Sequence, residues 1–147
     1  MIHDFRQESN ADSKENRESL FKNIPESMRQ VDRWVLWKLE TRKGSEKPTK
    51  VPYQVSGIPA SSTNPDTWCS FADAVLSVGS FSGIGFMLGA GWLGIDLDNH
   101  IDDDGQFSDF AKETIERICS YTEISPSGKG IHIICKAHKP GNSTKSR

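Results

Sequence analysis

The apolar and polar positions along the chain change period several times, and each run predicts one element. Residues 34–39 are rich in aromatic and branched side chains and predict a strand. A charged loop over 41–48 and a short extended segment at 50–53 follow. Residues 1–19 have no apolar periodicity and predict a flexible polar tail. Ordered structure is therefore expected from residue 20, beginning with a short helical turn at 24–28.

The middle of the chain predicts a helix and then a hairpin. Ser70, with Asp73 three residues later, forms a capping box. Apolar residues then recur at helical spacing from Phe71 to Val78, which predicts a short amphipathic helix. Residues 83–88 and 92–98 are strand-like and flank a Gly-Ala-Gly turn, so we expect them to pair as a hairpin.

The last third predicts one more helix and two strands. Apolar positions between Phe107 and Cys119 lie on one face of a helix. Residues 121–125 and 131–136 are strand-like and are joined by a turn of Pro, Ser and Gly. This order of elements predicts an α+β fold, a mixed sheet with helices packed on one face. We expect the domain to cover residues 20–140, followed by a polar C-terminal end at 141–147.

Length and composition exclude several classes of protein. The chain has 147 residues, of which 35% are hydrophobic, and a formal charge of −2. This length fits one domain, and the charge excludes a uniformly basic nucleic-acid binder. No apolar run approaches the roughly 18 residues of a membrane span, and no secretory leader is visible. Three widely spaced Cys do not suggest a disulfide framework. We expect a soluble cytoplasmic protein without membrane association.

The charges are segregated along the chain. Residues 29–50 hold seven basic and three acidic side chains, residues 96–109 hold six Asp and no Lys or Arg, and residues 129–147 hold five basic side chains and no acid. Carboxylates bracketed by basic segments suit a site for metal ions and phosphates. Three solvated surface blocks would give the same pattern, so the motifs have to decide.

The first motif is Asp96-Leu97-Asp98 at the end of a predicted strand. Because strand side chains alternate, both carboxylates project from one face while Leu97 points to the core. Two nearby carboxylates repel each other unless a cation lies between them, and Mg²⁺ or Mn²⁺ suits oxygen ligands. Such an ion can clamp nucleotide phosphates. Two Asp that face water at a strand end remain the alternative.

The second motif runs from Ser125 to His132. Gly128 and Gly130 allow the backbone to approach an anion, and the Ser127 hydroxyl and Lys129 can add a hydrogen bond and a charge. His132 is on the strand that follows, where it can donate to a triphosphate. The spacing excludes a Walker A loop. A plain hairpin turn with one inward histidine is the alternative.

Two other metal sites fit the sequence poorly. The register of a calcium-binding EF-hand loop would place His100 first and Ala111 twelfth, where acidic residues are required. His132, Cys135 and His138 do not suggest zinc, because Cys135 faces away from His132 on a strand.

Together these motifs resemble the catalytic core of the archaeo-eukaryotic primases, in particular the primase–polymerase domain at the N-terminus of phage and plasmid replication proteins. The likeness covers roughly residues 23–140. Besides the two motifs, it rests on Ile24-Pro25, Trp34-Val35-Leu36-Trp37, Lys50-Val51-Pro52-Tyr53, Ala60-Ser61-Ser62, Trp68, Gly83-Ile84-Gly85-Phe86 and Tyr121-Thr122-Glu123-Ile124.

The resemblance implies roles for several residues. Asp96 and Asp98 would hold Mg²⁺ or Mn²⁺ and, with His132, form the catalytic group. The turn from Ser127 to Gly130, together with His132, would contact the triphosphate of the incoming nucleotide, and Lys50 would line the same cleft. The implied fold is a sheet like that of RNA-recognition modules. The implied reaction is two-metal nucleotidyl transfer in DNA replication, with nucleoside triphosphates, a DNA template or primer, and a helicase as partners.

The sequence departs from the family at its end. The family has a third acidic residue after the histidine motif, but no Asp or Glu follows Glu123 here. We therefore expect a core that is incomplete at the C-terminus, either a fragment of a longer replication protein or a natural truncation. The main hypothesis is a primase–polymerase enzyme. The alternatives are a non-catalytic nucleotide- or nucleic-acid-binding remnant or regulator, and a purely structural α+β domain.

Overall fold

The computed structural model describes residues 2–6, 21–41, 43–44, 46–125 and 127–137. The chain forms two compact units, Met1–Met87 and Leu88–Arg147, which are described in turn. No helix within the described residues is long and apolar enough to cross a membrane.

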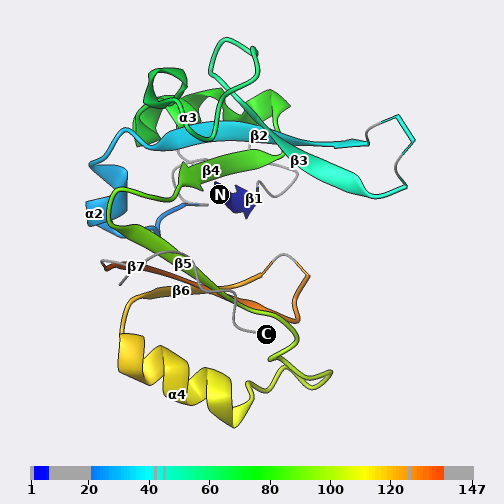
Figure 1. Ribbon diagram of the computed structural model, residues 1–147, viewed down its shortest axis with the longest axis vertical. Helices are drawn as coiled ribbons and strands as arrows, with labels where there is room; N and C mark the ends of the chain where they lie inside the picture. The colour runs from blue at the N-terminus through cyan, green and yellow to red at the C-terminus, as the bar shows by residue number, and fades with distance from the viewer. Residues whose placement is uncertain (1, 7–20, 42, 45, 126, 138–147) are drawn as a thin grey trace. The chain divides into compact units, whose positions relative to one another are not determined.

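The first unit contains a four-stranded antiparallel sheet of order β1-β4-β2-β3. Its elements are β1 (Ile2–Arg6), α2 (Glu26–Arg29), β2 (Trp34–Thr41), β3 (Pro48–Tyr53), α3 (Phe71–Ser77) and β4 (Gly83–Met87), with short 3₁₀ turns at Pro65–Thr67 and Val78–Ser80. Figure 1 shows α3 lying along β2.

The core of the first unit is built around β2. The first four residues of this strand, Trp34 to Trp37, are fully buried. The Trp34 ring lies 5.1 Å from that of Phe71 on α3 and 5.0 Å from that of Phe86 on β4, both edge-on. α3 begins at Ser70, whose hydroxyl accepts from the Asp73 N–H and donates to the Asp73 carboxylate. Ser70 is confirmed as the N-cap, and it sets the start of the helix that covers Trp34.

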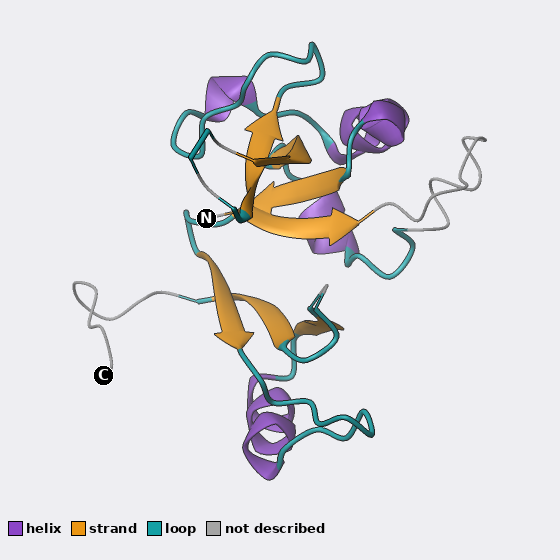
Figure 2. Cartoon of the chain, turned by 90° about the vertical axis from the view of Figure 1, so that its right-hand side faces the viewer, coloured by secondary structure: helices purple, strands orange, loops and turns teal. Residues whose placement is uncertain are grey.

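The second unit is a three-stranded antiparallel sheet, covered on one face by a helix. Its elements are β5 (Trp92–Leu97), α4 (Asp109–Ile118), β6 (Tyr121–Ile124) and β7 (Ile131–Lys136), in the sheet order β5-β7-β6. Its core consists of Leu97, Ile101, Ala111, Ile131 and Ile133. Figure 2 shows α4, the lowest purple helix, on one side of this small sheet.

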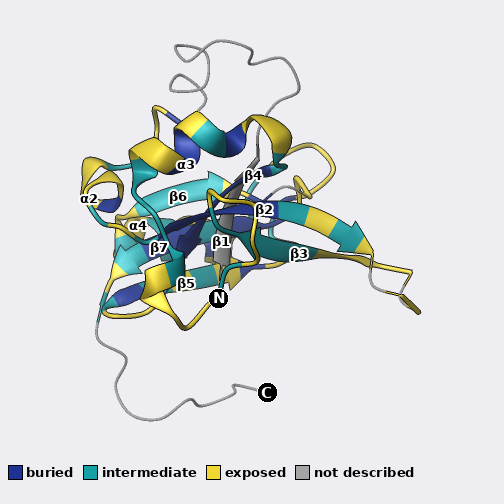
Figure 3. Cartoon of the chain, turned by 90° about the horizontal axis from the view of Figure 1, so that it is seen from above, coloured by how far each residue is buried: buried dark blue, intermediate teal, exposed yellow. Residues whose placement is uncertain are grey.

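Helix α4 has a defined start and end. The Ser108 hydroxyl accepts from the Ala111 N–H, and Cys119 ends the helix in the left-handed conformation at φ 47°. Ala111 is fully buried, whereas Phe110, which the sequence placed on the same apolar face, is 59% exposed. The buried and exposed faces of the helices can be followed by colour in Figure 3.

The predicted α+β class is confirmed, as are the strands and helices expected after residue 24. The strands form two antiparallel sheets, where the sequence suggested one mixed sheet. The predicted hairpin of 83–88 with 92–98 is wrong: β4 pairs with β1 and β2, and β5 pairs with β7. A local turn at Gly89–Trp92 does form, but a turn does not determine which strands pair.

The ends of the chain were expected to be polar tails. β1 lies within the segment assigned to the N-terminal tail, where it pairs with β4. The remainder of that segment and the expected C-terminal end at 141–147 lie outside the described residues.

Candidate functional site

The register of the small sheet brings the two predicted motifs together. Asp96 on β5 is the Cα partner of His132 on β7, and His132 is in turn the partner of Glu123 on β6. The His132 Nε2 atom lies 3.9 Å from Asp96 Oδ1, and Nδ1 lies 3.5 Å from Glu123 Oε1. A row of two carboxylates with an imidazole between them therefore crosses all three strands.

This row occupies the sheet face opposite α4. Ile131 and Ile133, the neighbours of His132, pack into the core beneath α4, so the alternating side chain of His132 points the other way. The side chains of His132 and Glu123 are 17% and 18% exposed, and that of Asp96 is 46% exposed. Asp96 is thus the member of the row most accessible to a ligand.

Sequence reasoning missed Glu123 as a member of this site. Its signal was the alternation of Tyr121 and Glu123 along a short strand, which puts both on one face. The Tyr121 hydroxyl donates to Glu123 Oε2 at 2.7 Å. Burial, and then the charge and hydrogen bond of Glu123, raise the pKa of Tyr121 well above its ordinary value. The phenol therefore stays neutral and serves as a hydrogen-bond donor to the carboxylate.

Asp98 lies at the end of the sheet that also carries the glycine turn. It directly follows Leu97, the last residue of β5, whose Cα partner on β7 is Ile131. Ile131 in turn directly follows Gly130. Both predicted motifs therefore meet at one end of the sheet. Asn99, next after Asp98, has a φ of 59°, so the chain turns sharply there.

The turn from Ser125 to Gly130 is held by its own hydrogen bonds. The buried Ser125 pairs with Gly130 through its backbone N–H, and its hydroxyl accepts from the Gly130 N–H at 3.0 Å. The Gly128 N–H donates to the Ser125 carbonyl at 2.8 Å, and the φ of Gly128 is 75°. The Ser127 hydroxyl lies 2.9 Å from that of Ser125. The positive φ explains the glycine at position 128.

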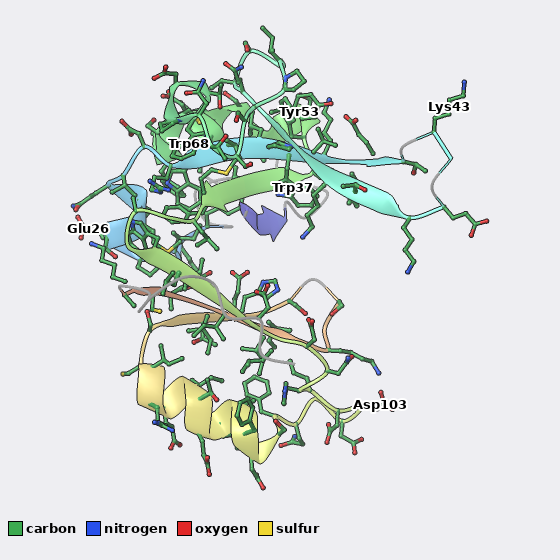
Figure 4. The ribbon with its side chains drawn as sticks, in the orientation of Figure 1. Glu26, Trp37, Lys43, Tyr53, Trp68 and Asp103 are labelled. Carbon is green, nitrogen blue, oxygen red and sulfur yellow. The ribbon has the colours of Figure 1, made fainter. Side chains whose placement is uncertain are left out.

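The turn is also tied to the acidic segment after β5. The Ile101 N–H donates to the Lys129 carbonyl at 3.1 Å. The Lys129 ammonium lies 2.6 Å from Asp103 Oδ1, and both side chains are exposed. Asp103, labelled in Figure 4, belongs to a turn in which Asp102 accepts from two backbone N–H groups. Asp102, Asp103 and Asp104 are all exposed, and the charge of Lys129 is already paired.

Lys50 is in the other unit. It lies on β3, where its ammonium group is 5.5 Å from the centre of the Trp37 ring, on the face that includes Leu39. The expectation that it lines the same cleft as Asp96 stays a prediction.

The donors of the site fit a divalent cation only in part. Among the described residues, no group of three or more His, Cys, Asp or Glu side chains is arranged to hold a metal ion. Asp96 and Asp98 supply two carboxylates. Mg²⁺ is commonly held by one or two carboxylates together with water and substrate phosphates, so two carboxylates suit a cation that arrives with a nucleotide.

Comparison with known proteins supports the resemblance seen in the sequence. No family model matches the chain. The chain is similar to the DNA primase-polymerase of Nitratiruptor phage NrS-1, with 35% identity over 113 residues, or 73% of this chain. The chain spans about 15% of the length of that relative. The similarity supports a relation to the primase–polymerases.

Proposed function

We propose that this chain is the nucleotide-handling part of a DNA primase–polymerase of the phage or plasmid replication type. The observation that carries the proposal is the pairing of Asp96 with His132, at the sheet end where Asp98 and the Ser127–Gly130 turn meet. The 35% identity to a phage primase-polymerase supports the same assignment.

Asp96 and Asp98 would hold Mg²⁺ or Mn²⁺ in this function. The bound cation would neutralise phosphate charge and lower the pKa of an attacking primer hydroxyl. The exposure of both carboxylates suits an ion that is shared with a substrate.

The other residues would bind the triphosphate and orient it. His132 Nε2 faces the β5 side, where it would donate to a phosphate oxygen beside Asp96. Lys129 would add a positive charge by exchanging Asp103 for phosphate, which costs little because the ion pair is exposed. The turn from Ser127 to Gly130 would limit how closely the phosphates approach the sheet. A DNA template, a primer and a helicase are the partners expected of the whole replication protein.

Nucleotide binding by the 147-residue chain tests the site. Titration calorimetry with dGTP and GTP, with and without MgCl₂, should show binding that depends on the metal. Changing Asp96→Asn and Asp98→Asn together should abolish the metal-dependent part. Asp104→Asn, in the same acidic segment but in the exposed turn, is the matched control and should bind as the wild type does.

An extension assay on a primed DNA template separates the enzyme from the alternative. Incorporation that is lost in the Asp96→Asn, Asp98→Asn variant supports nucleotidyl transfer. Metal-dependent binding without incorporation supports the non-catalytic nucleotide-binding module. A chain that neither binds nor incorporates nucleotides would overturn both.

A further inference from the structure

Glu123 has no role in the function proposed above, yet it is in contact with the histidine of that site. It occupies the β6 end of the row Asp96–His132–Glu123, and its side chain is only 18% exposed. A carboxylate so far removed from water is costly unless hydrogen-bond donors surround it. Its two oxygens face two different groups, Tyr121 on one side and His132 on the other.

The arrangement distinguishes the two nitrogens of the imidazole. Nδ1 faces Glu123 across 3.5 Å, and Nε2 faces Asp96 across 3.9 Å. Rotation about the last torsion of histidine has a broad energy profile, so the torsion by itself does not strongly select one ring orientation. A carboxylate on the β6 side favours the orientation that brings Nδ1 toward it. Nε2 is then left facing β5, the strand that carries Asp96.

Tyr121 fixes the carboxylate in turn. Its hydroxyl donates to Glu123 Oε2 at 2.7 Å, which leaves Oε1 on the side of His132. Tyr121 and Glu123 are two residues apart on β6, so strand alternation places both on the face that carries His132. The two residues thus form a support for the ring from one strand.

Glu123 is poorly placed to share a metal ion with Asp96. β5 and β6 lie on opposite sides of β7, so the two backbones are roughly 10 Å apart, twice the spacing of neighbouring strands. The imidazole of His132 lies between the two carboxylates. A contact to His132 is the role that this position allows.

We propose that Glu123 is a positioning residue, which holds the His132 ring so that Nε2 faces the triphosphate side of the sheet, and that Tyr121 holds Glu123 in place. This proposal rests on the proposed function, because it gives His132 a ligand to contact. In this proposal Tyr121 and Glu123 support the residue that binds the nucleotide. Both lie on β6, a strand to which the sequence analysis gave no role in the site.

The test is a double-mutant cycle on dGTP affinity in the presence of MgCl₂, measured by calorimetry on the 147-residue chain. Glu123→Ala should weaken binding about tenfold, because the ring loses the carboxylate that faces Nδ1. The same change in a His132→Ala background should have no further effect, because the ring that Glu123 positions is gone. A purely structural role would weaken binding by the same factor in both backgrounds, and that result would overturn the proposal.

Conservative variants keep the test valid if Glu123→Ala folds poorly. Glu123→Gln keeps an acceptor for Nδ1 and should recover most of the affinity, and Tyr121→Phe should lose about threefold. Thr122→Val, on the opposite face of β6, is the matched control and should leave binding unchanged. Thermal unfolding of each variant reports whether the fold is kept.

A second readout separates this inference from the proposed function. Nitrogen-15 NMR of the His132 ring in the free protein should change in Glu123→Ala and stay as in the wild type in Thr122→Val. An unchanged ring spectrum in Glu123→Ala would overturn the positioning role even if dGTP binds. A wild-type chain that fails to bind dGTP would instead overturn the proposed function, whatever the ring spectrum shows.

Discussion

The ammonium nitrogen of Lys129 lies 2.6 Å from Oδ1 of Asp103, a residue 26 positions earlier in the chain. The two side chains are 57% and 91% exposed, so the pair stabilises the fold by at most about 1 kcal/mol. Its larger consequence is electrostatic. The carboxylate of Asp103 competes with any phosphate for the one charged side chain of the glycine turn.

Removing that carboxylate should therefore strengthen nucleotide binding. Asp103→Asn should raise dGTP affinity about twofold to fivefold at low salt, because the Lys129 charge becomes available, and the gain should shrink as salt screens it. Calorimetry at two ionic strengths measures both effects. Asp104→Asn changes the net charge equally and should leave the affinity as in the wild type. Equal gains in the two variants would mean that only the overall charge matters.

The space around Gly130 makes it sensitive to a single methyl group. A Cβ at this position would lie 3.0 Å from the Ser125 hydroxyl and 3.2 Å from the Leu97 carbonyl, and backbone cannot move easily. Gly130→Ala should lower the free energy of unfolding by about 1–3 kcal/mol and weaken dGTP binding as the turn shifts. At Gly94 the added methyl would meet only the flexible end of Leu88. Gly94→Ala should therefore cost less, as denaturant unfolding of both variants would reveal.

The face of each site residue could be predicted from the sequence, but its partner could not. Alternation put Asp96 and His132 on the face opposite the apolar Leu97 and Ile131, because a period of two determines the face of a strand whichever strand lies beside it. That Asp96 lies opposite His132 depends on the register of β5 against β7, which are separated by α4 and β6. Such long-range pairing leaves no local signal.

The lack of a local signal for strand pairing also explains why the predicted hairpin of 83–88 with 92–98 is wrong. Gly89, Ala90 and Gly91 all have positive φ, and the turn they form resembles a hairpin connection. Its flanking strands nevertheless pair in different sheets, because β4 pairs with β2 and β5 pairs with β7.

The role of Glu123 in the site could not be predicted from the sequence, because it too depends on which strands pair. An acidic residue on a short strand usually faces water, and the contact of Glu123 with His132 depends on which strand lies beside β6.

The cysteines should differ strongly in reactivity. Burial and the nearby charges of Asp73 and Asp32 raise the pKa of the Cys69 thiol to about 12, and its sulfur donates to the Trp34 carbonyl. Cys119, at the end of α4, is exposed. Because the thiolate is the reacting species, iodoacetamide at mildly alkaline pH should modify Cys119 and leave Cys69 intact.

Mass spectrometry of peptides over time measures the cysteine reaction. Cys119→Ser should remove the rapid phase and leave the slow modification of Cys69 unchanged. Rapid labelling of Cys69 in the folded chain would contradict the burial seen around Trp34. Labelling in denaturant is the control, because there the two thiols should react at similar rates.

Tyr121 should make the stability of the chain depend on pH in the alkaline range. Burial and then Glu123 raise the pKa of its hydroxyl in the folded state above the ordinary value of 10.0. The folded chain therefore keeps this proton at a pH where the unfolded chain has lost it. Its contribution to stability is fully present below about pH 10 and is lost as the pH rises toward the folded-state pKa.

The free energy of unfolding of the wild type should accordingly fall above about pH 10. In Tyr121→Phe the fall should be smaller, because no proton is held at this position. Urea unfolding at a series of pH values measures the two slopes, and parallel slopes would show that the Tyr121 proton is not held by the fold.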